Sequence, residues 1–434
     1  MFENSVKFKL LPDKVDFSIF IFWIIGVLIT KVNFSNYILF FIGIFLIFVI
    51  GKKLINFQPG LLFLIFISTY LIYLIPLIFF NTPIASHSQF DNILYYNKTL
   101  SIFIFFLFSL NYFLFKSQDV SQKIILNSIL KRYPSSGIFY SLLLFQLFII
   151  VYASYKGQFI LNSSDSYDAY RSNLENQNGL WEYFLIFYIL SFIFSSNTKI
   201  NRFLMLVIYL LYFYISITRG YRIQLIQMTF LYFILFYDGK FSNKILILFS
   251  SFGLLLMELY GLVKVIGNVS SDIVNVAIDS NQMAFVTNQT EVFYSTTSVL
   301  TLQSQGHLGI GVQIETFFAF ILNFIVPTGL LWNGSRVIDH VWQFAEIGGG
   351  GFCFGYFYFW FGYVGVILLA LYLGKLFNAR FKNSNIFILF LIFTISLTPR
   401  WFAYEPTNHL IRLPLTLVIL YVFILNFFKK SNSL

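Results

Sequence analysis

The sequence predicts an all-α, polytopic membrane protein with about twelve transmembrane helices and one large periplasmic loop, forming a single integral membrane domain over residues 1–434. Of the 434 residues, 58% are hydrophobic and only 11% are charged, whereas soluble domains carry about 25% charged residues. Apolar runs recur along the chain, and one stretch, residues 264–351, is too polar to be buried in lipid. The net charge of +10 is spread over many loops, so nucleic acid is not an expected partner, whereas membrane lipid is.

The twelve apolar runs are long enough to span a bilayer once their flanks are included. Some are shorter than the roughly 20 residues that a span needs, but Tyr, Trp and Lys at their ends belong at the interface and extend them. The runs are Phe17–Thr30, Tyr37–Ile50, Leu61–Phe80, Leu100–Phe115, Ile138–Tyr155, Leu180–Ser196, Phe203–Ile217, Ile223–Tyr237, Ile245–Val263, Phe352–Gly374, Ile386–Leu397 and Leu413–Phe428.

The basic residues predict the orientation of these runs, because translocated loops are depleted of Lys and Arg. With both termini inside, 18 of the 28 basic residues fall on the cytoplasmic side and 10 outside. The inner set holds 15 Lys and 3 Arg, while the outer set holds 4 Lys and 6 Arg. Arg grips phosphate or carboxylate with a planar fork of donors, so the outer arginines indicate an anionic ligand. Chance, or arginines that snorkel to lipid phosphates, would give the same pattern.

One further apolar run, Val312–Leu330, lies inside the large loop and is not expected to span. A span there would turn the basic residues that follow it outward, against the charge distribution. Its apolar residues fall at helical spacing, while Glu315, Asn323 and Pro327 interrupt it. We therefore expect a helix that lies on the outer leaflet, or dips into it and returns.

The large loop carries the first group of residues that could do chemistry. Arg336, Asp339, His340 and Glu346 precede the glycine run Gly348–Gly351. A histidine or carboxylate near arginine suits deprotonation of a hydroxyl nucleophile as a phosphate leaves. The glycines let the backbone approach a ligand closely or turn tightly into the next span.

The remaining outer arginines fall in three shorter loops. Arg219 and Arg222, with Tyr221 between them, form a turn so short that two spans must pack as a hairpin. A charged side chain at that depth is energetically costly unless it is paired with an opposite charge or binds a ligand. A phosphate-bearing lipid would supply one, and snorkelling would also explain it. Arg400 and Arg412 lie in a proline-rich loop with His409, and Arg171 lies in a loop rich in Ser, Asp and Tyr.

Several classes of site are absent from the sequence. There is no His-rich or carboxylate-rich metal spacing, no Walker motif and no dinucleotide fingerprint, so no metal or cofactor is expected. The single cysteine, Cys353, excludes internal disulfides.

The segment after the large loop resembles a family of membrane glycosyltransferases. Residues 346–358, Glu-Ile-Gly-Gly-Gly-Gly-Phe-Cys-Phe-Gly-Tyr-Phe-Tyr, followed by Phe361-Gly362-Tyr363-Val364-Gly365, are similar to the corresponding span of Wzy-type O-antigen polymerases, which join oligosaccharide repeat units. The Arg219-Gly220-Tyr221-Arg222 hairpin, the Arg171 loop and the twelve-span layout are also similar to that family.

This resemblance implies polymerisation of undecaprenyl-pyrophosphate-linked O-antigen or capsule repeat units at the periplasmic face of the bacterial inner membrane, with a chain-length regulator and a flippase as partners. The donor's pyrophosphate would leave as a sugar hydroxyl of the acceptor unit attacks. Arg171, Arg219, Tyr221, Arg222, Arg336, Arg400 and Arg412 would bind pyrophosphate or sugar, and His340, Glu346 and Asp339 are the catalytic candidates. Two alternatives stay open: an O-antigen ligase, and a flippase or other transporter of lipid-linked oligosaccharides.

Overall fold

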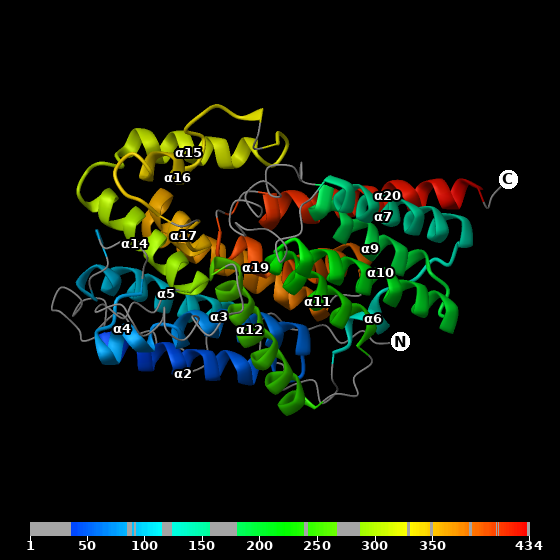
Figure 1. Ribbon diagram of the computed structural model, residues 1–434, viewed down its shortest axis with the longest axis horizontal. Helices are drawn as coiled ribbons and strands as arrows, with labels where there is room; N and C mark the ends of the chain where they lie inside the picture. The colour runs from blue at the N-terminus through cyan, green and yellow to red at the C-terminus, as the bar shows by residue number, and fades with distance from the viewer. Residues whose placement is uncertain are drawn as a thin grey trace.

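The described part of the chain is built from helices, without β-strands (Figure 1). A computed structural model of the protein describes residues 36–84, 89–90, 93–114, 124–156, 180–237, 242–266, 287–327, 330–347, 350–381, 384–404, 406 and 408–431. Its α-helices are α2 (Asn36–Leu54), α3 (Gln58–Ile72), α4 (Ile75–Phe80), α5 (Ile93–Phe113), α6 (Leu126–Ile129), α7 (Ser136–Lys156), α9 (Leu180–Phe194), α10 (Lys199–Thr218), α11 (Arg222–Phe236), α12 (Asn243–Ile266), α14 (Asn288–Ser304), α15 (Ile310–Leu322), α16 (Val337–Val341), α17 (Cys353–Asn378), α18 (Asn385–Ser396), α19 (Thr398–Trp401) and α20 (Leu413–Ser431). A 3₁₀ turn, η4 (Ala379–Phe381), and a π-helical turn, η5 (Asn408–Arg412), complete them.

Six stretches of helix in the described residues are long and apolar enough to cross a membrane. They are α2, α3 with α4, α7, α10, α17, and the last residues of η5 with α20. Helices α9, α11, α18 and the apolar part of α12 are shorter. Eleven of the twelve predicted runs thus lie in or overlap helices, and Phe17–Thr30 lies outside the described residues. The prediction of a helical membrane protein is confirmed, while twelve spans and a periplasmic loop stay predictions.

Segments that the charge distribution assigns to the cytoplasm meet one another at helix ends. The backbone N–H of Tyr133 donates to the carbonyl of Ile193 at 2.9 Å, and the Lys131 backbone is bonded in both directions to the Asn385 side chain, each at 3.0 Å. Gln58 donates to Asn243 at 2.6 Å. Loops far apart in sequence but on the same expected side are therefore neighbours in space.

Helix α14 is buried against α5 and α17 although it carries many hydroxyl groups. The hydroxyls of Thr296, Thr297 and Ser298 each donate to the backbone carbonyl four residues earlier, at 3.0 Å. These internal bonds satisfy the three hydroxyls, which lowers the cost of burying this part of the helix in the core.

The glycine-rich stretch around the start of α17 makes close packing possible. A Cβ on Gly351 would lie 2.7 Å from Oγ1 of Thr296, and one on Gly355 would lie 2.5 Å from its Cγ2. Oγ1 of Thr296 also accepts a 2.7 Å bond from the backbone N–H of Phe352. At these two glycines, the backbone therefore lies directly against α14. Gly348 and Gly349 lie outside the described residues.

Two details complete the path of the chain to the site. Helix α17 is interrupted at Gly362, whose φ of 59° is unfavourable for a residue with a Cβ. Helix α15 has 13 residues and ends at Leu322, so it covers only the first part of the run Val312–Leu330 and is shorter than the roughly 20 residues that a span needs.

Candidate functional site

A carboxylate, an imidazole and a guanidinium from three separate elements meet at the N-terminal end of α9. Oε1 of Glu182 lies 2.7 Å from Nε2 of His409 and 3.8 Å from Nε of Arg400. The side chain of His409 is 8% exposed and that of Glu182 19%. Arg412 adds a favourable electrostatic interaction with the same carboxylate. We call Glu182, Arg400, His409 and Arg412 the α9 cluster.

Local sequence explains why α19 presents Arg400 to this cluster. Pro399 lies at the start of α19, where the ring's fixed φ favours a helix and its missing N–H costs nothing. Trp401 is fully buried, and its indole N–H donates to the carbonyl of Thr394 at 2.9 Å. Because Trp401 anchors one side of this single turn in the core, the neighbouring Arg400 faces the end of α9.

A π-helical turn presents His409. The hydroxyl of Tyr372 on α17 donates to the carbonyl of Leu410 at 3.2 Å, which ties η5 to the core. Such turns are rare and occur frequently at functional sites. Helix α20 follows directly, with Pro414 as its second residue.

The predicted Arg219 hairpin lies beside the α9 cluster. Gly220 adopts a φ of 78°, the left-handed conformation that favours glycine, and allows α10 to turn directly into α11. Arg219 is buried, and its Nη2 donates to the carbonyl of Ser154 on α7 at 2.7 Å. Its guanidinium therefore holds two helix ends together.

Aromatic stacking connects the hairpin to the cluster. Trp181, adjacent to Glu182, stacks on Tyr212 of α10 with ring centroids 4.5 Å apart, and its ring lies 6.0 Å from that of Tyr221. Arg222 is the first residue of α11 and is partly exposed. The structure thus brings together two loops that the sequence separates by about 180 residues, the Arg219 hairpin and the loop with Arg400 and Arg412.

The other predicted residues form a second group on α16. Asp339 accepts from Nη2 of Arg336 at 2.6 Å, and the backbone and side chain of Arg336 pair with Asp339 as a helix cap. Nε2 of His340 lies 2.8 Å from the carbonyl of Gly334 and 4.0 Å from Oε2 of Glu315. Figure 1 draws α16 and α19 in different parts of the molecule. We call Glu315, Arg336, Asp339 and His340 the α16 cluster.

Glu346 and Arg171 are the last two predicted residues. Glu346 follows α16 and is exposed. Arg171 lies outside the described residues. Within the described residues, no group of three His, Cys, Asp or Glu side chains is arranged to hold a metal ion.

Glu182 and Glu315 are the acidic members that sequence reasoning did not assign to a site. Each lies in an otherwise apolar helix, and an isolated carboxylate in such a helix is itself the signal, because it needs a partner. His409 carried a weaker signal, its position between two outer arginines.

Chemically, the α9 cluster combines proton transfer with anion binding. A buried carboxylate fixes the orientation of an imidazole, as in general-base pairs. Arg400 and Arg412 place positive charge beside the pair, where a phosphate group would be neutralised. Comparison of the chain with protein-family models, with curated proteins and with solved structures found no match.

Proposed function

We propose that the protein is a bacterial inner-membrane glycosyltransferase that polymerises undecaprenyl-pyrophosphate-linked oligosaccharide repeat units at the periplasmic face. One observation carries this proposal: the largely buried pair of Glu182 and His409, with two arginines beside it, at the N-terminal end of α9. The surrounding bundle contains helices of membrane-spanning length. A base beside phosphate-binding groups suits the transfer of a sugar from a pyrophosphate to a hydroxyl. The outward orientation rests on the charge distribution of the loops.

In this mechanism, His409 accepts the proton of the acceptor hydroxyl. Its Nε2 faces Glu182, so Nδ1 is the ring nitrogen left to act as the base. The hydroxyl oxygen attacks the anomeric carbon of the donor glycan, a glycosidic C–O bond forms, and the C–O bond to pyrophosphate breaks. Arg400 and Arg412 neutralise the charge that develops on the leaving pyrophosphate.

The geometry favours His409 over His340 as the base. Asp339 is already paired with Arg336, and Nε2 of His340 lies against a backbone carbonyl. The closest partner of each lies within six residues in sequence, Arg336 for Asp339 and Gly334 for His340, as a structural role for α16 requires. Arg222, which is partly exposed, is assigned to the lipid-facing side of the pyrophosphate site, while the buried Arg219 and Tyr221 hold the hairpin beside it.

The experiment is the glycan length made by cells that carry Arg400→Ala or Arg400→Lys at matched protein level. Losing one charge-assisted contact costs about 1.5–3 kcal/mol, which corresponds to roughly ten- to hundredfold in rate. Lys restores charge but not the fork, so it should rescue only partly. Arg202→Ala is the matched control, because Arg202 bonds Asn197 at an end expected in the cytoplasm.

The outcome also separates a polymerase from a ligase. A polymerase variant leaves surface glycan of a single repeat unit, whereas a ligase variant removes all surface glycan. Full-length polymer from both Arg400 variants would reject the proposed site.

Burial of charge favours a second candidate, a transporter of lipid-linked oligosaccharides. Arg219 is 2% exposed at the end of α10, and charge inside a helical bundle commonly marks a transport path. A transporter variant would keep the lipid-linked unit on the cytoplasmic face. Labelling of periplasmic lipid-linked glycan in the Arg219→Ala strain therefore separates the two, because a polymerase variant accumulates the unit outside.

A further inference from the structure

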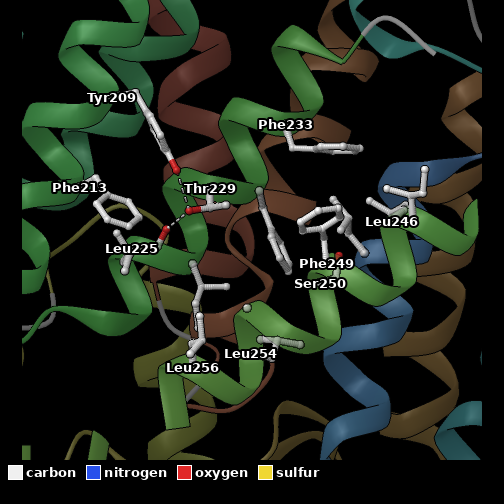
Figure 2. A pocket seen from close by; sticks show the side chains of 15 residues that line it. Tyr209, Phe213, Leu225, Thr229, Phe233, Leu246, Phe249, Ser250, Leu254 and Leu256 are labelled. Atoms are coloured by element: carbon white, nitrogen blue, oxygen red, sulfur yellow. Dashed lines mark hydrogen bonds between the residues drawn. The ribbon is translucent and has the colours of Figure 1, made fainter. Parts of the chain in front are cut away.

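An apolar pocket lies between the hairpin helices and α12 (Figure 2). It has a volume of about 390 Å³ and is lined by α10, α11, α12 and Leu62 of α3. Five of its lining side chains are aromatic: Tyr209, Phe213, Phe230, Phe233 and Phe249. Two of the stretches beside the pocket have membrane-spanning length: α10, and α3 together with α4. The pocket therefore lies among helices that we expect hydrocarbon to surround.

Of the three polar side chains in the lining, Tyr209, Thr229 and Ser250, the first two are tied into hydrogen bonds. The hydroxyl of Thr229 donates to the carbonyl of Leu225 at 2.8 Å, and the hydroxyl of Tyr209 lies 3.3 Å from Oγ1 of Thr229. Figure 2 shows this chain of bonds at one side of the pocket. Because these groups bond one another, an apolar occupant can enter without leaving them unsatisfied.

The pocket begins close to a cation. Leu225 lies three residues, or about one helical turn, after Arg222 on α11. No carboxylate of the described residues is paired with Arg222. From Leu225 to Phe233 the lining extends about 12 Å along α11 at 1.5 Å per residue. A phosphate at Arg222 would therefore leave its hydrocarbon chain at the mouth of the pocket.

We propose that this pocket holds the first isoprene units of the polyprenyl tail of the donor lipid, with its phosphate at Arg222. The inference rests on the proposed function and adds to it a binding site for the carrier lipid. A polyprenyl chain bears a methyl branch and a double bond on every unit, so it brings more contacting atoms per unit of length to the lining than a straight acyl chain does. The aromatic lining thus favours it over a straight acyl chain.

Gly253 provides a direct test because it lines the pocket and a Cβ there would meet no atom within 4 Å. Gly253→Phe fills the space with an apolar ring, and glycine is the poorer helix former, so the helix is retained. The matched control is Gly137→Phe on α7, another helical glycine whose Cβ would meet nothing within 4 Å.

Binding of a polyprenyl monophosphate, inorganic pyrophosphate and phosphatidylglycerol is measured on the purified full-length protein in detergent by native mass spectrometry. Displacing two or more buried methylenes should weaken polyprenyl phosphate binding by at least about tenfold in Gly253→Phe, with pyrophosphate binding and the Gly137→Phe control unchanged. Arg222→Ala should weaken binding of the polyprenyl monophosphate and of pyrophosphate.

Two results would overturn the proposal. The first is polyprenyl phosphate binding that is unchanged in Gly253→Phe. The second is phosphatidylglycerol that binds the original protein as tightly as polyprenyl phosphate does and loses as much affinity in Gly253→Phe. Because these measurements involve no turnover, they separate the two inferences. Normal polymer from the Arg400 variants rejects the proposed function and leaves the pocket standing.

Discussion

Glu182 is the residue on which the α9 cluster depends, because it contacts His409 and Arg400 directly. Without this carboxylate, the guanidinium of Arg400 loses the negative charge that compensates it for leaving water. The imidazole of His409 loses the group that orients its ring. The arrangement is therefore a unit, in which removal of one member changes the others.

We predict that Glu182→Gln lowers polymerisation by about a hundredfold or more, within the range of general acid–base contributions. Glutamine keeps the volume of the side chain but not the charge that orients His409. Single-turnover formation of the dimeric repeat unit by purified protein measures the chemical step. His409→Gln should match this loss, and the double variant should add little to it.

The competing assignment is tested in the same assay with Glu346→Gln and His340→Gln. Loss of the chemical step in these two variants, with Glu182→Gln unaffected, would return the proton transfer to the region of α16.

At the scale of elements, α5 and α17 pack so closely that one position tolerates no side chain. A Cβ on Gly374 would lie 2.5 Å from Cβ and 3.0 Å from the carbonyl oxygen of Phe113. The same carbonyl oxygen of Phe113 also accepts a hydrogen bond from the side chain of Asn378 at 2.9 Å. Close approach through small residues is how helices associate in lipid, where no hydrophobic force draws them together.

We predict that Gly374→Ala destabilises the protein by about 1–3 kcal/mol, the usual cost of overpacking. Thermal unfolding in detergent can be monitored through the aggregation of a fluorescent fusion protein. The midpoint temperature of Gly374→Ala should be lower than that of the original protein. Gly253→Ala is the control, because a Cβ there meets open space and alanine is the better helix former. Equal midpoints for the two variants would show that the α5 and α17 contact relaxes easily.

Elements also show where sequence reasoning succeeds and where it stops. Long apolar runs such as Tyr37–Ile50 fall within helices because composition and length alone decide them. Helix α14 was not predicted, since Ser, Thr and Gln are frequent in it and its burial depends on hydroxyl bonds within the helix. Only the fold supplies α5 and α17 as its neighbours.

For the whole molecule, the distribution of basic residues predicts which loops face the cytoplasm. Alkaline phosphatase fused after Gly306 should be active, and the same enzyme fused after Lys382 inactive, because translocated loops are poor in Lys and Arg. Cysteines introduced at Gly309 and Asn333, on the two sides of α15, should both react with a membrane-impermeant reagent. The native Cys353 is buried, so its background is low. Protection of one introduced cysteine alone would restore a span at α15.

The candidate site was predictable in its parts and not in its assembly. The excess of outer arginines singled out Arg219, Arg400 and Arg412, all of which the structure places at or beside the α9 cluster. The partnership of Glu182 with His409 spans more than 200 residues of sequence. Nothing local specifies such a contact, because it follows from how α20 packs against both α9 and η5.

The bond from Arg219 to Ser154 bears on the order in which the chain assembles. Its acceptor belongs to α7, 65 residues earlier, so the ribosome delivers the receiving helix before the hairpin of α10 and α11. A guanidinium at the edge of the bilayer is costly without a partner. Insertion of the hairpin is therefore easiest once α7 is in place, and a truncated chain that begins after α7 should leave the hairpin exposed to quality-control proteases.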